Sequence, residues 1–493
     1  MKSGKRNPSL LAALIPVIFL TVAISLNVFI FQEQSLSGSN QIVLLFSAAV
    51  AVLVCMIYGK TWKDLLQGIV NSIGSAIPAI LILLMIGALA GTWLISGIVP
   101  AMIYYGLQIM HPTFFLVTAA IISSIVSLST GSSWSTVATI GIALLGIGRA
   151  LGIPDGMIGG AIISGAYFGD KISPLSDTTN LAAAISETEL FTHIKYMMIT
   201  TIPSYLITLV IFVFLGFRDT SAISRTDIAQ VQSSLDSIFN ITPWLFLVPV
   251  VVILLIMKKV PALPAIFIGT VAGAVFALIF QPHLIGLLSE QSGSFLKQSY
   301  VVIVQSMYTN TDIPAENELV NGLLSTGGMK GMLNTVWLII SAMVFGGVMD
   351  AGGLLKKITS SIIKVARNTT SLIASTAATC LFLNVTASDQ YLSILIPGKM
   401  FAEIYKRRKL KSQNLSRTLE DSGTVTSVLV PWNTCGATQS TVLGISTIVF
   451  LPYCFFNIIS PFMTILVAML KIKIARKDEE KKEPPSPNNT DGK

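Results

Sequence analysis

The sequence predicts an all-α polytopic membrane protein with two inverted-topology repeats, broken helices, re-entrant hairpins and about 10–13 membrane segments. Three observations carry this prediction. Of the 493 residues, 53% are hydrophobic and only 11% are charged, whereas soluble proteins carry about 25% charged residues. No Asp, Glu, Lys or Arg occurs between Asp64 and Arg149. Apolar stretches long enough to cross a hydrocarbon core of roughly 30 Å recur along the chain.

Eight apolar stretches are the predicted membrane-spanning helices. In chain order they are Leu10–Phe31, Ile42–Tyr58, Ile77–Ile95, Met197–Gly216, Thr242–Met257, Pro261–Phe280, Thr335–Met349 and Ser446–Leu470. The first is too long for the apolar core of a secretion signal and lacks a clear cleavage site, so we expect an uncleaved helix with a cytoplasmic N-terminus. Gly and Pro interrupt four further apolar segments, which are the expected broken or re-entrant ones: 112–148, 156–185, 370–405 and 416–445.

A polar segment divides the chain into two halves. The expected units are a cytoplasmic tail (1–9), a first membrane repeat (10–216), a polar linker (217–240), a second membrane repeat (241–470) and a disordered cytoplasmic tail (471–493). Each half contains a small-polar break followed about 35 residues later by an acidic break, and paired broken helices indicate a transporter site. The connector 399–417 is strongly basic and its counterpart 149–155 is nearly uncharged, which favours opposite orientations of the repeats.

The net charge of +8 does not indicate a nucleic-acid partner, because the basic residues lie in tails and loops without interleaved aromatic residues. Basic loops of this kind are typical of the cytoplasmic side. They predict a multi-pass protein of the cell membrane with both termini in the cytoplasm, in contact with membrane lipid. The cysteines are expected to be small buried hydrophobic side chains, since no CxxC pair or Cys/His cluster occurs: Cys55, Cys380, Cys435 and Cys454.

Residues Gly169–Asn180 place two carboxylates, four hydroxyls, an amide and a proline within one short stretch of an apolar region. Charged groups at membrane depth are costly and usually bind something charged. Pro174 breaks a helix and frees backbone carbonyls, as in ion sites built on interrupted membrane helices. The candidate residues of this half are Asp170, Ser173, Asp177, Thr178 and Asn180, with Thr130, Ser132 and Ser133 from the preceding hairpin tip.

The second half repeats this order of breaks. A small-polar break at Asn384–Asp389 precedes an acidic break at Leu419–Thr424 and a further break at Pro431–Thr434. The candidate residues of this half are Thr386, Ser388, Asp389, Glu420, Asp421, Thr424 and Asn433.

Structural roles are the alternatives for several candidates. Asp170 could pair with the adjacent Lys171 at a hinge, Asp177 could begin a helix, and Glu420 and Asp421 could pair with the basic loop at the surface. The three histidines are expected at the membrane interface rather than in a proton relay: His111, His193 and His283. Trp134 and Trp432 are expected to pack in the core, with a role in shaping a cavity as the alternative.

Three stretches of the sequence resemble the NhaC family of sodium/proton antiporters. They are GDKISPLSDTTNLA (Gly169–Ala182), LEDSGTVTSVLVPWNTCGA (Leu419–Ala437) and STGSSWSTVATIG (Ser129–Gly141). The resemblance in hydropathy covers most of residues 10–470. It implies a secondary transporter that exchanges sodium for protons by alternating access, although some relatives exchange organic acids such as malate and lactate.

Sodium is a hard cation that prefers oxygen ligands, which the two sets of candidates supply. Asp170, Asp177 and Asp389 are the expected carboxylate ligands. Because desolvation disfavours the charged form of a carboxylate, sodium and protons would compete for the same oxygens, and exchange would need no separate proton site. No cofactor is expected besides the transported sodium.

Other functions remain as alternatives to sodium/proton exchange. The first is a sodium-coupled exchanger of a small organic acid, for which Lys171 and Lys399 are the only nearby cations. The second is a channel. An enzyme is not expected, because the sequence contains no P-loop and no Ser–His or metal-ligand constellation. The oligomeric state is left open, and a homodimer is one option.

Overall fold

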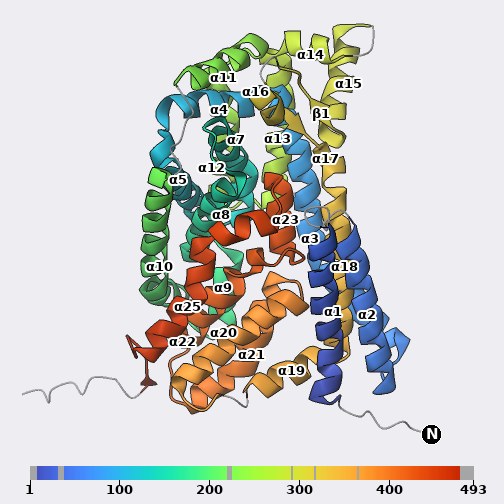
Figure 1. Ribbon diagram of the computed structural model, residues 1–493, viewed down its shortest axis with the longest axis vertical. Helices are drawn as coiled ribbons and strands as arrows, with labels where there is room; N and C mark the ends of the chain where they lie inside the picture. Colours follow the sequence, from blue (N-terminus) through green and yellow to red (C-terminus); the bar gives the residue numbers. More distant parts are fainter. Residues whose placement is uncertain are drawn as a thin grey trace, which may run out of the picture.

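The computed structural model describes residues 8–31, 38–218, 225–289, 293–315, 318–363 and 366–477. Helices dominate it (Figure 1). The first half contains α1 (Leu10–Phe31), α2 (Ser39–Ile57), α3 (Trp62–Ile95), α4 (Ile98–Ile109), η2 (Pro112–Phe114), α5 (Phe115–Thr130), α6 (Ser133–Thr136), the π-helical η3 (Val137–Gly141), α7 (Ile142–Ala150), α8 (Asp155–Ile172), α9 (Asp177–Ile185) and α10 (Leu190–Arg218).

A short helix, α11 (Arg225–Ile238), connects the halves. The second half contains η4 (Pro243–Phe246), α12 (Leu247–Met257), α13 (Ala262–Phe280), α14 (Pro282–Leu288), α15 (Phe295–Tyr308), β1 (Thr311–Asp312), α16 (Glu318–Leu323), β2 (Ser325–Thr326), α17 (Gly328–Gly331), α18 (Leu333–Ala351), α19 (Leu354–Ile363), α20 (Thr369–Thr386), α21 (Gln390–Arg407), α22 (Gln413–Leu419), the π-helical η5 (Glu420–Thr424), η6 (Ser427–Leu429), α23 (Thr434–Leu443), α24 (Thr447–Phe450), η7 (Leu451–Tyr453) and α25 (Phe455–Met469). The antiparallel strands pair Thr311 with Thr326 and Asp312 with Ser325.

Eight helices of the described residues are long and apolar enough to cross a membrane, and up to ten if each of two sharply bent helix pairs is one span. The predicted class of all-α polytopic membrane protein is therefore confirmed. The predicted span Leu10–Phe31 coincides with α1. The predicted single span Ser446–Leu470 is wrong, because the chain there forms α24, η7 and α25, with Pro452 at the start of η7.

Two long helices, α3 and α18, lie side by side and run in opposite directions. Gly68, near the start of α3, lies against Gly347 and Ala351 at the end of α18. An added Cβ on Gly87, further along α3, would lie 2.5 Å from the carbonyl oxygen of Gly328, just before α18. In lipid the hydrophobic effect does not drive helices together, and small residues stabilise their contact by allowing the two backbones to pack closely.

Each half contains one helical hairpin with the same kind of tip. In the first, α5 ends at Gly131, which has a φ of +69°, and the Ser132 side chain caps α6 by accepting from the Ser135 N–H at 3.2 Å. In the second, α20 leads to Ser388, with a φ of +58°, and Asp389 caps α21 by accepting from the Leu392 N–H at 2.9 Å. A left-handed residue followed by a capping side chain reverses the chain and starts a new helix.

Each half also contains a broken helix with a capping residue after the break. Ser176 caps α9, and Asn433 caps α23. The 44 positions from Ser132 to Ser176 equal the 44 positions from Asp389 to Asn433. The hairpin of α5 lies in the upper part of Figure 1 and the hairpin of α20 and α21 in the lower part. The inverted repeat stays a prediction, which this spacing and the opposed α3 and α18 support.

Two of the predicted extramembrane segments, the C-terminal tail and the linker, are more ordered than expected. Residues 471–477 do not begin a disordered tail: Leu410 pairs with Arg476, and the Lys411 N–H donates to the Ala475 carbonyl at 2.9 Å. Residues 478–493 lie outside the described part. The polar linker 217–240 contains α11, which packs against α4 and α16.

Candidate functional site

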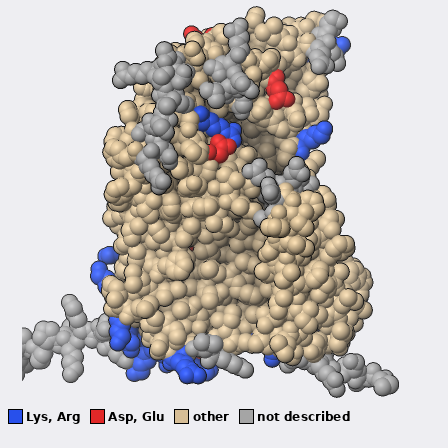
Figure 2. All heavy atoms as spheres, viewed as in Figure 1, with Lys and Arg blue, Asp and Glu red and all other residues tan. Residues whose placement is uncertain are grey.

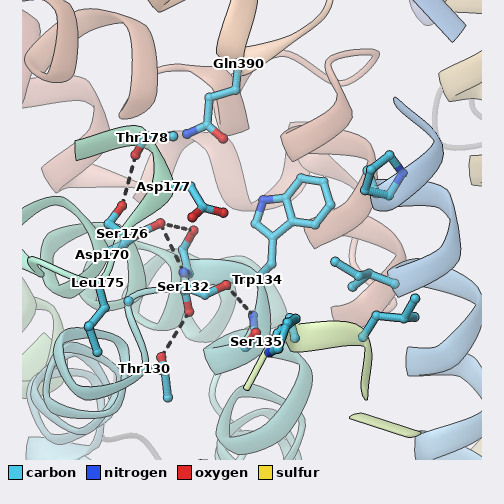
Figure 3. Close-up of a pocket in the computed structure, with 18 of the residues that line it drawn as sticks. Thr130, Ser132, Trp134, Ser135, Asp170, Leu175, Ser176, Asp177, Thr178 and Gln390 are labelled. Carbon is cyan, nitrogen blue, oxygen red and sulfur yellow. Dashed lines mark hydrogen bonds between the residues drawn. The ribbon is translucent and has the colours of Figure 1, made fainter. Parts of the chain in front are cut away.

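A cavity of about 1050 Å³ lies where the hairpin tips meet the break between α8 and α9 (Figure 3). Residues 130–135 and 174–178, Asp170, and the first residues of α21 and α23 form one wall. The other wall consists of residues 75–79, Leu81 and Ile82 of α3, together with Ile256 and residues 259–263 at the turn between α12 and α13. The cavity therefore lies between the broken helices and the long helix α3.

Asp170 reaches the cavity wall from the last turn of α8 and is only 6% exposed. One of its oxygens, Oδ2, accepts two hydrogen bonds from Ser133, one from the N–H at 3.1 Å and one from Oγ at 2.7 Å. The Asp170 carboxylate therefore lies at the start of α6, where the backbone N–H groups favour a negative charge. It also interacts electrostatically with Asp177.

Asp177 is the first residue of α9, and its side chain is exposed to the cavity (Figure 3). The helix begins here, as the structural alternative expected, but Ser176 rather than Asp177 is the capping residue. The Asn180 side chain donates to the carbonyls of Pro174 at 3.0 Å and Ser176 at 2.7 Å, so its amide group joins the first turn of α9 to the proline break. Thr178 lines the cavity as well.

Asp389 approaches from the opposite hairpin and is 4% exposed. The next residue, Gln390, also lines the cavity and donates to the Thr424 carbonyl at 3.3 Å. The carbonyl of Ser388 accepts from the Thr434 N–H at 3.0 Å, which holds the hairpin tip against the start of α23. The two halves of the chain therefore contribute to one cavity.

Within the part of the chain that the structure describes, five helix N-termini converge on this cavity. Their first residues, which all line it, are Ser133 of α6, Asp177 of α9, Ala262 of α13, Gln390 of α21 and Thr434 of α23. Each N-terminus carries a partial positive charge that stabilises a nearby carboxylate. The arrangement therefore tolerates acidic side chains in an apolar surrounding, and their oxygens could hold a cation. Among the described residues, no three His, Cys, Asp or Glu side chains are close enough to hold one metal ion.

Several predicted site residues do not line the cavity. Ser173 donates to the Leu128 carbonyl at 2.8 Å and so joins α8 to α5. Thr386 donates to the Phe382 carbonyl at 2.8 Å, and Asn433 donates to the Asn384 carbonyl at 3.1 Å. Thr424 is buried in η5. For these residues, as for those in the cavity wall, a role in ion binding stays a prediction.

Glu420 and Asp421 lie in a second place, a buried charge cluster formed with Lys171, His193 and Arg417. All five side chains are fully buried. Lys171 forms an ion pair with Asp421 and contacts Ser460 Oγ at 3.3 Å. Surface pairing of Glu420 and Asp421 is therefore wrong, and so is a hinge pair between Asp170 and Lys171, because adjacent side chains on α8 point to different surroundings.

The expectation that all three histidines are interfacial is wrong for His193. This side chain is fully buried where α10 packs against α22 and α25. Neither ring nitrogen has a hydrogen-bond partner among the described residues. His111 and His283 are exposed. The expectation for the four cysteines is confirmed, since all are buried and unpaired with one another.

Sequence reasoning missed the Lys or Arg side chain that lines the cavity in the described part of the chain. It is Lys259 in the turn between α12 and α13, rather than Lys171, which is buried elsewhere, or Lys399, which is exposed. Nothing in a short polar turn indicates which distant segment it faces. Trp134 and Trp432 both pack against the hydrophobic core, as expected. Trp134 also lines the cavity, and Trp432 donates to the Val385 carbonyl at 2.8 Å.

Comparison with known proteins identifies the class of this fold. The model of the Na+/H+ antiporter family matches residues 165–472. The Na+/H+ antiporter NhaC of Bacillus subtilis is 36% identical over 96% of this chain and 100% of that protein. The malate-2H+/Na+-lactate antiporter of the same species is 36% identical over 94% of each chain. The arginine/ornithine antiporter ArcD of Halobacterium salinarum is 35% identical over 86% of this chain and 85% of that protein.

The chain is thus a multi-pass membrane protein related over nearly its whole length to antiporters. It belongs to the Na+/H+ antiporter family, which confirms the resemblance stated from Ser129–Gly141, Gly169–Ala182 and Leu419–Ala437. All three stretches lie at or next to the cavity and the buried charge cluster.

Proposed function

We propose that this protein is a secondary antiporter that exchanges sodium for protons across the cell membrane. The observation that carries the proposal is the placement of Asp170, Asp177 and Asp389 in the wall of one cavity. Each carboxylate lies at a helix N-terminus: Asp170 against the start of α6, Asp177 at the start of α9 and Asp389 at the start of α21. The relatives named NhaC support the choice of sodium and protons.

The three carboxylates do not converge on a single ion. Asp170 and Asp177 interact with each other, whereas Asp389 approaches from the second hairpin. A sodium ion at this site would therefore draw mainly on Asp170 and Asp177, with hydroxyl and carbonyl oxygens completing its shell. When the ion leaves, two neighbouring carboxylates are left charged at a cost in free energy, so the empty site favours uptake of a proton by the protein.

Two cavities at opposite ends of α23 support alternating access. Thr434, at the start of α23, lines the larger cavity. Leu443 and Gly444, at its other end, line a second cavity of about 410 Å³. Residues 75–79, Leu81 and Ile82 of α3 face the first cavity and Ile86 the second. Cavities divided by a helix favour a carrier that opens to one side at a time over a channel.

The orientation in the membrane is part of the proposal. Figure 2 shows a broad band without Lys, Arg, Asp or Glu and a group of Lys and Arg side chains along the lower edge. Figure 1 places α19, α21 and α22 at this end. Under the positive-inside rule this end faces the cytoplasm. The exposed apolar side chains of α1 would contact lipid.

The test is sodium uptake into proteoliposomes driven by an imposed pH gradient, with no organic acid present. Uptake that collapses the gradient supports sodium/proton exchange. Absence of uptake until malate or lactate is added would reject it in favour of an organic-acid exchanger with sodium as the coupling ion.

A sodium-coupled exchanger of small organic ions is the second candidate. The observation that favours it is the cavity volume of about 1050 Å³, which falls at the upper end of the range for small-molecule sites. Relatives named for malate and lactate or for arginine and ornithine transport lie in the same range of identity. A carboxylate substrate would face Lys259, whereas an amine would face Asp170 and Asp177.

A further inference from the structure

The buried charge cluster is separate from the cavity. None of its five members, Lys171, His193, Arg417, Glu420 and Asp421, lines the cavity wall. The cluster lies instead between α8, α10, α22, η5 and α25, which pack against one another. Fully buried ionisable groups in a membrane protein are costly and usually functional.

Many polar atoms of this cluster lack partners. Neither carboxylate oxygen of Glu420, nor Oδ2 of Asp421, has a hydrogen-bond partner of normal geometry among the described residues. The same holds for all three guanidinium nitrogens of Arg417 and both ring nitrogens of His193. Buried polar groups are normally paired with protein or with ordered water. The cluster therefore offers both donors and acceptors to water and protons.

Glu420 is the carboxylate of this cluster whose charge is least compensated. Asp421 has Lys171 as its ion partner and also accepts from Thr200 Oγ1 at 3.2 Å and Ser460 Oγ at 3.3 Å. Arg417 always keeps its charge. On its own segment, Glu420 interacts with Asp421 and with Thr424, neither of which carries a positive charge.

Several titratable groups interact electrostatically with Glu420, namely Asp170 and Lys171 on α8, Asp421 on η5 and the Cys380 thiol on α20. The other ionisable members of the cluster are Arg417 on α22 and His193 on α10. Glu420 is also the first residue of the π-helical segment η5, and its backbone carbonyl accepts from the Val425 N–H at 3.4 Å. The π-helix is rare, and single π-helical turns within α-helices are frequently found at functional sites.

We propose that Glu420 carries the proton of the exchange, at a site separate from the cavity that holds the sodium ion. This proposal rests on the proposed sodium/proton exchange and replaces the expectation that no separate proton site is needed. One Glu420 oxygen takes a proton from water on one side of the membrane and becomes neutral. It returns the same proton to water on the other side, and no other bond changes.

Asp170 connects the two sites. Its carboxylate lies in the cavity wall and also interacts electrostatically with Glu420. When sodium leaves the cavity, the negative charge of Asp170 favours a neutral, protonated Glu420. When sodium binds, its positive charge offsets that of Asp170 and Glu420 releases its proton. The repulsion between the Asp170 and Glu420 carboxylates thus couples the binding of one sodium ion to the release of one proton.

Arg417 marks a route for protons to Glu420. It lies one helical turn before Glu420, with its guanidinium 4.6 Å from the centre of the Tyr196 ring. The Tyr196 hydroxyl lies 2.6 Å from Asn414 Oδ1 and 2.7 Å from the Lys473 carbonyl oxygen, two acceptors that share its one hydrogen, near the end of the described chain. The proton would therefore enter the cluster beside residues 471–477.

The test uses the full-length protein in proteoliposomes with the variant E420Q, which mimics the protonated carboxyl group. Radioactive sodium exchange against internal sodium, at equal pH, should stay within about threefold of the wild type. Sodium uptake driven by a pH gradient should fall to background. Loss of both activities in a monodisperse E420Q protein, or retention of both, would overturn the proposal.

Two further variants control this test. S422A removes a hydroxyl from the same π-helical segment that likewise lacks a partner among the described residues, and it should keep both activities. E420D keeps a carboxylate and should keep pH-driven uptake with a shifted pH profile. An unchanged profile in E420D would contradict a proton-carrying role even if E420Q fails to accumulate. If the wild type itself shows no pH-driven uptake, the proposed function fails, and the proton site with it.

Discussion

Ser133 donates to one carboxylate oxygen of Asp170 twice, from Oγ at 2.7 Å and from the backbone N–H at 3.1 Å. The two residues are 37 positions apart, on the first hairpin tip and at the end of α8. The orientation of the cavity carboxylate therefore depends on the conformation of the hairpin tip. Any movement of α5 and α6 against α8 would change the position of this carboxylate in the cavity wall.

Removing the Ser133 hydroxyl should weaken cation binding without unfolding the protein. A hydrogen bond to a charged group is worth about 1.5–3 kcal/mol, so S133A should raise the sodium concentration for half-maximal uptake by about tenfold or more. The measurement is sodium-dependent uptake under a fixed pH gradient. S135A is the matched control, because the Ser135 hydroxyl lines the same cavity but has no partner among the described residues. Equal half-saturation values for the two variants would contradict a role for the Asp170 contact.

Neutralising Asp177 should abolish exchange in a folded protein. Its side chain is exposed to the cavity and caps nothing, so D177N changes charge at little structural cost. Proteoliposome uptake and elution from a sizing column measure the two properties separately. D236N on α11, an exposed carboxylate far along the chain from the cavity residues, serves as the charge-matched control. Retained pH-dependent exchange in D177N would remove Asp177 from the ion site.

Removing one partner of the buried Lys171–Asp421 ion pair should lower the stability of the protein far more than removing one partner of an exposed pair. Removing one partner of a buried ion pair leaves an uncompensated charge and costs about 3–5 kcal/mol. K171M and D421N should therefore lower the thermal unfolding midpoint in detergent strongly, and the double variant K171M/D421M should recover part of the loss. The Arg149–Asp155 pair, with side chains 32% and 40% exposed, is the control. R149M should cost only about 0–1 kcal/mol, and a larger loss than in K171M would contradict this account.

The class of fold and the general position of the site could be predicted because both follow from local sequence. Long apolar stretches give the membrane helices, and the polar residues around Pro174 give the break. Capping side chains such as Ser132 and Asp389 start helices wherever they occur, so the hairpin tips are also local features.

The partners of individual charges could not be predicted, because they depend on contacts between distant segments. Asp170 and Lys171 are adjacent in the sequence, yet one faces the cavity and the other pairs with Asp421, 250 positions away. Lys259 reaches the cavity from a turn that carries no recognisable motif. His193 lies in a polar connector of the sequence but is buried by helices from the second half.

Substitution of the left-handed residue should destabilise the first hairpin tip much more than the second. Gly131 has a φ of +69°, and an added Cβ would lie 2.5 Å from the Leu175 Cβ. G131A should therefore be destabilised by more than about 1–2 kcal/mol through backbone strain and contact. Ser388 has a φ of +58° with an ordinary side chain, so it already bears that strain. The free energy of unfolding of S388G should lie within about 1 kcal/mol of the wild-type value, because relief of backbone strain offsets the greater freedom of glycine in the unfolded chain.

Thermal unfolding of both variants in the same detergent measures this difference directly. G444A provides a control for the left-handed conformation alone, since Gly444 has a φ of +63° and nothing lies within 4 Å of its added Cβ. G131A should be less stable than G444A, because only Gly131 faces Leu175. If G131A and G444A lose equal stability, the cost is strain alone, and close packing of the first hairpin tip against the α8–α9 break does not hold the cavity wall in place.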